Sequence, residues 1–152
     1  MRLSEQAVVD GDFEALAALR LQAMRDSLQA LGRYDPVRSR ERLLAGFRAE
    51  LARHILVDER RVGFYLLDTG SAAWRLQHLY LLPEACGQGI GARVMAGLCE
   101  RARRAGASLT LSALKGSRSN HFYLAQGFVP IGASEWDIDY CWTPPADTAV
   151  NV

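Results

Sequence analysis

Three glycines stand at alternate positions near the middle of the chain, in a segment that runs from Gly87 to Ala92 and reads GQGIGA. A predicted strand precedes this segment and a helical pattern follows it. Glycines let backbone N–H groups approach a ligand without a Cβ atom in the way, and the N-terminus of a helix adds partial positive charge. Because a glycine costs about 1 kcal/mol relative to alanine in a helix, this spacing favours a diphosphate-binding turn over a connection that is merely rich in glycine.

Two nucleotide-binding motifs are similar to this turn, and each requires a residue that the sequence lacks. Gly87-x-Gly89-x-x-Ala92 matches the dinucleotide fingerprint, which needs an acidic residue at the end of the next strand. The next predicted strand, 109–114, is followed by Lys115. A P-loop needs Gly-Lys followed by Ser or Thr, which is also missing. The turn therefore indicates a different phosphate-containing cofactor, and a nucleotide-dependent reductase is disfavoured.

Other side chains could transfer protons or bind charged groups. His78 has a residue type that titrates at about 6.5 when free, but its expected neighbours are apolar and a role in the core explains it equally well. The residue type of Tyr123, taken alone, fits a core position better than a catalytic one. Glu135, Asp137 and Asp139 alternate along a late predicted strand. They belong either to an edge strand that faces water or to a cleft that attracts a cation.

The overall composition excludes several classes of protein. The 152 residues suffice for one domain with its own core, and the net charge of +1 argues against bulk electrostatic binding of nucleic acid. No apolar run approaches the about 20 residues that span a bilayer, and residues 1–10 contain no apolar segment of a secretory signal. Cys86, Cys99 and Cys141 form no CxxC pair and no zinc-spaced cluster. We therefore expect reduced thiols, no metal site, no membrane partner and a cytoplasmic protein.

The elements that must position these residues begin with a strand at 3–9 and two helices. Asp10 or Asp12 can cap the first helix, and Gly32 can end it. Ser39 is expected to cap the second helix. Apolar residues recur along the two helices at helical spacing: Phe13, Leu16, Ala17, Met24, Leu28 and Leu31 in the first, and Leu44, Phe47 and Leu51 in the second.

Strands and helices alternate in the remainder of the chain. In the strand at 73–81, period-two alternation places Trp74, Leu76, His78 and Tyr80 on one face. The helix after the glycines carries an apolar stripe and ends at Gly106. The other elements are expected as strands at 55–57, 62–67, 109–114, 128–131 and 135–142, and a short helix from Ser119 or Asn120 to Gln126. This order predicts one α/β domain over residues 1–143 with a single mixed sheet, followed by a tail at 144–152.

Two motifs in this order resemble the GNAT superfamily of acyl-CoA N-acyltransferases. The segment from His78 to Ala92 is similar to the family's strand followed by Q/R-x-x-G-x-G/A. The segment from Asn120 to Phe128 is similar to its helix with an aromatic residue, a tyrosine and Gly-Phe. Cys86 departs from the usual Gln or Arg. Where the family often has Asn-Pro, this chain reads GSRS, so Ser117 or Asn120 is left to supply that polar contact.

The resemblance implies a mostly antiparallel sheet with a V-shaped splay between two central parallel strands and helices on both faces. It also implies that acetyl-CoA binds with its pantetheine arm beside the strand that ends at Leu81, much like an added strand, and with its pyrophosphate on the glycine turn. The residues expected to bind the cofactor are Tyr80, Leu81, Cys86, Gly87, Gln88, Gly89, Ile90, Gly91, Ala92, Ser117, Asn120 and Tyr123.

The implied reaction is direct attack of a primary amine, on a small molecule or a protein, on the acetyl thioester. Tyr123 matches the family's tyrosine that protonates the departing thiolate, and a backbone N–H near Leu81 would stabilise the oxyanion. The base is either His78 or a chain of waters. Glu135 and Asp137 are candidates to contact the acceptor, favouring one with a second positive charge, and a homodimer is compatible with the family. The alternative is a CoA-binding regulatory module without turnover, which retention of Tyr123 disfavours.

Overall fold

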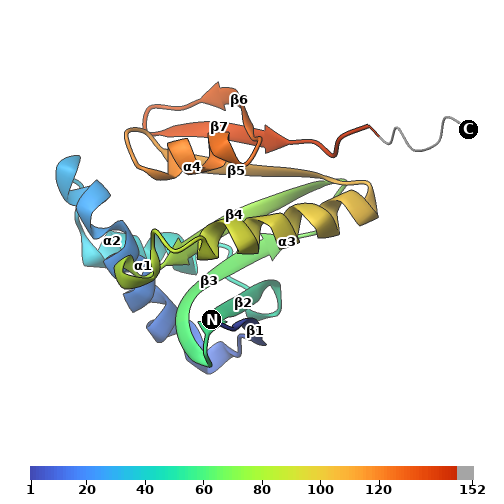
Figure 1. Cartoon of the computed structure of the whole chain (residues 1–152). Coiled ribbons are helices and arrows are strands. Elements are labelled where there is room, and N and C mark those ends of the chain that lie inside the picture. The colour runs from blue at the N-terminus through green and yellow to red at the C-terminus, as the bar shows by residue number, and fades with distance from the viewer. Residues whose placement is uncertain (147–152) are drawn as a thin grey trace, which may run out of the picture. The chain divides into compact units, whose positions relative to one another are not determined.

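The computed structural model describes residues 1–146, so the last six residues of the predicted tail lie outside it. Its strands and α-helices follow one another in the predicted order (Figure 1). They are β1 (Leu3–Ala7), α1 (Phe13–Ala30), α2 (Pro36–Leu44), β2 (Ala52–Val57), β3 (Arg60–Asp68), β4 (Ala73–Leu81), α3 (Ile90–Ala105), β5 (Ser108–Leu114), α4 (Ser119–Ala125), β6 (Val129–Ala133) and β7 (Asp137–Trp142), with short 3₁₀ turns at Asp10–Asp12, Ala49–Leu51 and Pro83–Ala85.

The strands form one open sheet in the order β1-β2-β3-β4-β5-β7-β6. The pairs β1–β2, β2–β3, β5–β7 and β6–β7 are antiparallel. β4 and β5 are parallel, and their pairing covers Ala73–Arg75 and Ser108–Thr110, at the beginning of each strand. The predicted mixed, mostly antiparallel sheet is confirmed.

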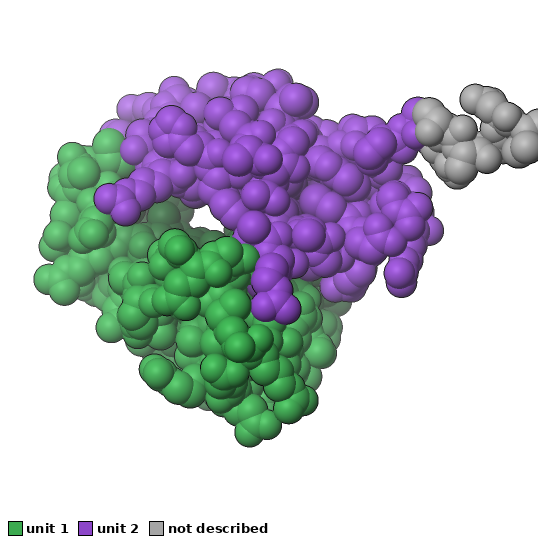
Figure 2. Space-filling model, viewed as in Figure 1, with its two compact units in different colours: residues 1–68, 76–91 green, residues 69–75, 92–152 purple. Residues whose placement is uncertain are grey.

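The chain divides into two compact units (Figure 2). Unit 1 comprises residues 1–68 and 76–91, and unit 2 comprises residues 69–75 and the chain from Ala92 onward. The strand β4 contributes residues to both. The single domain at 1–143 therefore stays a prediction, and the two units are described separately below.

The core of unit 1 lies between α1, α2 and the strands β2 and β3. Leu16 of α1, Leu43 of α2 and Phe64 of β3 are at most 1% exposed, and each side chain of this kind contributes about 1.5–3 kcal/mol when it is buried. The predicted apolar periodicity of α1 thus identifies its buried face. The cluster consists of Val8, Phe13, Leu16, Leu43, Ala49, Ala52, Phe64 and Leu66.

The predicted cap of the second helix is wrong. Asp35 caps α2, because its carboxylate accepts hydrogen bonds from the N–H groups of Val37 and Arg38 and because Pro36 occupies the first helical position, where its missing N–H costs nothing. Ser39 lies inside the helix and is buried. The helix ends at Leu44, so Phe47 and Leu51 follow it instead of continuing its face.

A two-residue turn joins β2 to β3. Asp58 and Glu59 both have positive φ, +49° and +68°, as a tight hairpin turn of this hand requires. The Asp58 carboxylate accepts a hydrogen bond from the N–H of Arg2 at 2.8 Å, and the Asp58 N–H donates to the Arg2 carbonyl oxygen. The strand predicted at 62–67 therefore begins two residues earlier, because Arg60 and Arg61 already belong to β3.

In unit 2, alternate residues of β5 are buried, among them Leu109, Leu111 and Ala113. The predicted stripe of α3 is buried at Val94, Leu98 and Ala102. β7 is paired on both sides, so the edge of the sheet at this end is β6.

Candidate functional site

The glycine turn connects β4 to α3 and has the backbone conformation that its glycines permit. Gly87 and Gly89 have φ of +77° and +79°, in the left-handed region that glycine adopts without strain. The turn is braced from the preceding residues, because the Leu82 N–H donates to the Val62 carbonyl oxygen at 2.8 Å and the Gln88 side chain donates to the Glu84 carbonyl oxygen at 2.9 Å.

The turn has the features of an anion site. A Cβ atom at Gly87 or Gly89 would meet no atom within 4 Å, so the space beside both residues is open. In the described part of the chain, the N–H groups of Gly87, Gln88 and Gly89 donate to no protein acceptor. The helix α3 begins at Ile90, and its first N–H groups lack intrahelical partners. Several free donors at a helix N-terminus, next to open space, fit a diphosphate.

The strand β4 leads into this turn past a glycine of β3. A Cβ atom at Gly63 would lie 2.3 Å from the Tyr80 carbonyl oxygen and 2.7 Å from a methyl carbon of Leu81. A side chain at this position would displace the end of β4, which carries the two residues expected beside the pantetheine arm.

Tyr80 is the centre of a hydrogen-bond network in unit 1. Its hydroxyl lies 2.8 Å from Nδ1 of His78 and accepts a hydrogen bond from Nε of Arg20 at 3.0 Å. Nη1 of Arg20 donates to the hydroxyl and the carbonyl oxygen of Ser39, at 2.6 and 3.2 Å. The Tyr80 ring also packs on Phe64, with 5.4 Å between ring centroids. His78 is thus held in a polar network, an environment that fits both a catalytic histidine and a hydrogen-bonded histidine of the core.

His78 and Tyr80 contact each other, as expected from an alternation along β4 that places both on one face. Tyr80 also reaches Arg20 in α1.

Tyr123 lies in α4 and is 7% exposed. Its ring packs against Phe122, Phe128 and Tyr140, with centroids 5.3, 5.7 and 6.1 Å apart. The ring is therefore fixed by an aromatic cluster, which serves packing and also holds the phenol in one orientation.

Asn120 satisfies its amide within unit 2. Its nitrogen donates to the carbonyl oxygens of Leu114 and Ser117 at 2.8 and 3.0 Å, and its oxygen accepts from the Tyr140 hydroxyl at 2.7 Å. The Ser117 hydroxyl lies 2.6 Å from that of Ser119. Asn120 thus links β5, α4 and β7. Its nitrogen also donates to the Ser117 hydroxyl at 3.2 Å, so both residues predicted to supply a polar contact already have hydrogen-bond partners.

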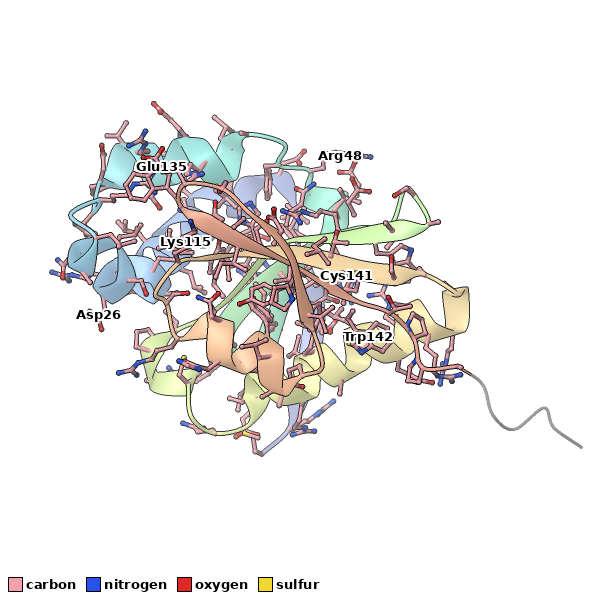
Figure 3. The ribbon with its side chains drawn as sticks, turned by 90° about the horizontal axis from the view of Figure 1, so that it is seen from above. Asp26, Arg48, Lys115, Glu135, Cys141 and Trp142 are labelled. Carbon is pink, nitrogen blue, oxygen red and sulfur yellow. The ribbon has the colours of Figure 1, made fainter. Side chains whose placement is uncertain are left out.

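The predicted row of carboxylates is shorter than expected. Glu135 is exposed and lies in the bend before β7, which begins at Asp137 (Figure 3). The Asp139 carboxylate accepts a 2.5 Å hydrogen bond from Ser112, whose hydroxyl oxygen accepts from Arg75 at 2.8 Å. The interpretation as an edge strand is wrong, since β7 lies between β5 and β6. Asp137 remains the candidate of this row for contact with a ligand.

Two polar features escaped the sequence analysis. One is His54, which lies in β2, is 2% exposed and has Nε2 2.9 Å from the Asp12 carboxylate. That hydrogen bond, followed by one from the Val9 N–H, lowers the pKa of Asp12 below its usual value. The other feature is buried Arg20. A signal existed for it, because Arg20 lies four residues from both Leu16 and Met24 on the apolar stripe of α1.

The three cysteines carry no disulfide in the structure. Burial raises the pKa of the Cys99 thiol to about 11, so that thiol is protonated and a poor nucleophile at neutral pH. Cys86 is exposed in the glycine turn. In residues 1–146, no cluster of three or more His, Cys, Asp or Glu side chains could hold a metal ion, and no helix has the length and hydropathy of a membrane span.

Residues 50–130, which include the glycine turn and α4, match the family model described as the acetyltransferase (GNAT) domain. A search of curated proteins finds no match.

The fold is similar to that of several solved structures. PaiA N-acetyltransferase from Thermoplasma acidophilum, in complex with coenzyme A, has a TM-score of 0.73 at 16% identity, over 94% of this chain and 99% of that one. Ribosomal-protein-S18-alanine N-acetyltransferase from Escherichia coli has a TM-score of 0.71 at 13% identity, over 99% and 100%. N-acetylglutamate synthase from Neisseria gonorrhoeae, complexed with coenzyme A and N-acetyl-glutamate, has a TM-score of 0.66 at 18% identity, over 96% of this chain and 36% of that one.

Proposed function

Because the chain belongs to the GNAT family of acetyltransferases, we propose that it binds acetyl-CoA at the glycine turn and transfers the acetyl group to a primary amine. The observation that carries the proposal is the turn itself, where the N–H groups of Gly87, Gln88 and Gly89 have no protein acceptor in the described part of the chain and the Cβ positions of Gly87 and Gly89 lie in open space. These donors match the charge and the acceptor oxygens of a pyrophosphate.

The other contacts of acetyl-CoA are assigned to the residues that the family resemblance predicts. The pantetheine arm would lie along the end of β4, at the backbone of Tyr80 and Leu81, and the pyrophosphate on Gly87 to Ala92. Cys86 lacks the polar side chain usual in the family, so backbone N–H groups would supply the binding. Ser117 or Asn120 would supply the additional polar contact. A coenzyme A complex of a protein with this fold supports the assignment.

Bound acetyl-CoA would supply a thioester whose carbonyl carbon the amine attacks. We assign proton donation to the leaving thiolate to Tyr123, whose ring is fixed by its aromatic neighbours. We assign proton removal from the amine to His78, directly or through water. If Nδ1–H of His78 donates to Tyr80, Nε2 carries the lone pair that would accept that proton; this tautomer is inferred from the network. Asp137 would attract the positive charge of the amine.

The test is a thiol-release assay with acetyl-CoA and a panel of amines that includes small amines, amino acids and peptides with free N-termini. Mass spectrometry should detect an acetylated amine together with equimolar free CoA. Coenzyme A should also raise the melting temperature. Binding of CoA without acetylation of any amine would instead support the regulatory module, and absence of CoA binding would refute the proposal.

A further inference from the structure

Arg20 is a buried cation without an acidic partner. It is 5% exposed, and in the described part of the chain no carboxylate lies within 4.0 Å of its guanidinium. Some of the exposed arginines of unit 1 are paired, because Arg2, Arg40 and Arg48 each have a carboxylate within that distance. Charged side chains are rarely buried unless they are paired, so the missing anion of Arg20 needs an explanation.

The hydrogen bonds of the Arg20 guanidinium show which of its nitrogen atoms can still bind a ligand. Nε donates to the Tyr80 hydroxyl, and both N–H groups of Nη1 are accounted for by the hydroxyl and the carbonyl oxygen of Ser39. Within residues 1–146, Nη2 donates to no protein atom, and it is not among the fully enclosed side-chain atoms without a partner. Three neutral oxygens therefore hold the group in place, while two N–H donors on Nη2 stay open to solvent or to a ligand.

We propose that Arg20 binds a carboxylate of the acceptor, so that the acceptor is an amino acid or another amine that carries a carboxylate. This inference rests on the proposed function. A guanidinium is suited to a carboxylate because its planar N–H groups match the carboxylate oxygens and keep their charge at all relevant pH values. His78, the assigned base, lies in the same network through Tyr80, so the group that anchors the acceptor and the group that receives its proton are fixed by one set of bonds.

The wild-type protein gives the first test, which compares each protein amino acid with its C-terminal amide as acceptor. Amidation removes the carboxylate and makes the neighbouring amine less basic, so more of it is unprotonated at neutral pH. Simple reactivity therefore favours the amide. We expect kcat/KM for the best amino acid to exceed that for its amide at least about 100-fold, as expected when a buried charge loses its partner. Equal or better use of the amides would overturn the proposal.

Variants locate the effect at Arg20. Arg20→Gln should lower kcat/KM for the amino acid about 100-fold more than kcat/KM for the amide, and should leave the KM for acetyl-CoA unchanged. Arg20→Lys should recover part of the loss. The matched control is Arg25→Gln, which removes an exposed arginine from the same helix and should leave both acceptors unaffected. An equal loss for acid and amide in Arg20→Gln would show that Arg20 only supports the structure.

A binding measurement separates this inference from the proposed function. Calorimetry with CoA-loaded wild-type protein should detect N-acetyl amino acids and not their amides, whether or not turnover is observed. If Arg20→Gln does not fold, Ser39→Ala, which removes one acceptor of Nη1 and keeps the charge, should weaken the same binding. Acetylation of amines with no preference for a carboxylate, together with no binding of N-acetyl amino acids, would leave the proposed function intact and refute the role of Arg20.

Discussion

At the scale of single residues, the proposed chemistry depends on side chains whose orientation is set by their neighbours. Tyr123 is held by three aromatic rings, and His78 is held through the Tyr80 hydroxyl. A proton donor must stay within hydrogen-bond reach of the leaving group through the reaction, so a fixed phenol is better suited to this task than a mobile one.

Tyr123→Phe removes only the hydroxyl and keeps the ring in its cluster. We expect it to lower kcat about 10²-fold, the low end for loss of a general acid, while the affinity for CoA and the melting temperature stay near those of the wild type. Stopped-flow thiol release can establish that chemistry limits the rate. Tyr65→Phe is the control, since it removes another buried phenol, which donates to Glu5 at 2.7 Å. Unchanged turnover in Tyr123→Phe would exclude the acid role.

Asp137 is the member of the acidic row that the structure leaves as a candidate for the acceptor. Asp137→Asn should raise the KM for the amine severalfold, because an attractive charge is lost, and should leave the KM for acetyl-CoA unchanged. The effect should shrink as salt screens the interaction. Glu135→Gln, in the preceding bend, is the matched control and should behave like the wild type. If the two variants have the same kinetics, the row is only a polar face of the sheet.

At the scale of elements, the glycine turn is defined by two left-handed residues that lead into α3. Gly89→Glu would place a carboxylate beside the free N–H groups and should reduce the affinity for acetyl-CoA at least about 100-fold through charge repulsion and steric block. Gly32→Glu is the control for backbone strain, because Gly32 also has positive φ, +66°, and open space around its Cβ position. Equal CoA affinity in folded Gly89→Glu and wild type, measured by calorimetry, would place the cofactor elsewhere.

The elements were largely predictable, because hydrophobic periodicity and glycine positions are local signals. The span of β4, 73–81, agrees in full, and the other strand boundaries differ by up to three residues, whereas α2 begins four residues before the predicted start and ends at Leu44 instead of continuing to Leu51. The errors arose where two signals compete. Ser39 and Asp35 are both cap residues, and Pro36 decides for Asp35. The network of Arg20, Tyr80 and His78 joins residues far apart in the sequence, and no local pattern encodes such a contact.

At the scale of the whole molecule, the two units divide the proposed roles. The three glycines of the turn belong to unit 1, together with the assigned base His78 and with Arg20, which is assigned to bind the acceptor carboxylate. Tyr123 and Asp137 belong to unit 2. Turnover in this scheme depends on the integrity of both units. The stability of unit 1 depends in part on the buried His54–Asp12 pair, which joins β2 to the segment before α1.

This pair predicts how stability changes with pH. The pKa of Asp12 is lowered in the folded state, first by the hydrogen bond with His54. Asp12 therefore binds protons less readily when folded, and its stabilisation is present above its usual pKa of 3.8 and is lost as the pH falls through the folded value. Urea unfolding should show Asp12→Asn to be less stable than the wild type at neutral pH, with a difference that narrows in acid. Asp10→Asn is the control. A difference independent of pH would contradict the assignment.

The tight turn between β2 and β3 contains a position where a single substitution should make the protein more stable to heat. Glu59 holds a left-handed conformation that disfavours L-residues, and its ion pair with Arg2, 3.9 Å long between side chains more than three-quarters exposed, contributes little. Glu59→Gly should therefore raise the free energy of unfolding by about 0.5 kcal/mol, the relief of strain exceeding the added freedom of the unfolded chain. Thermal unfolding would measure it, and a lower melting temperature would contradict it. Neither Glu59 nor Arg2 has a role in the proposed chemistry. The Glu59→Gly variant should therefore stay folded when it also carries active-site substitutions that lower stability.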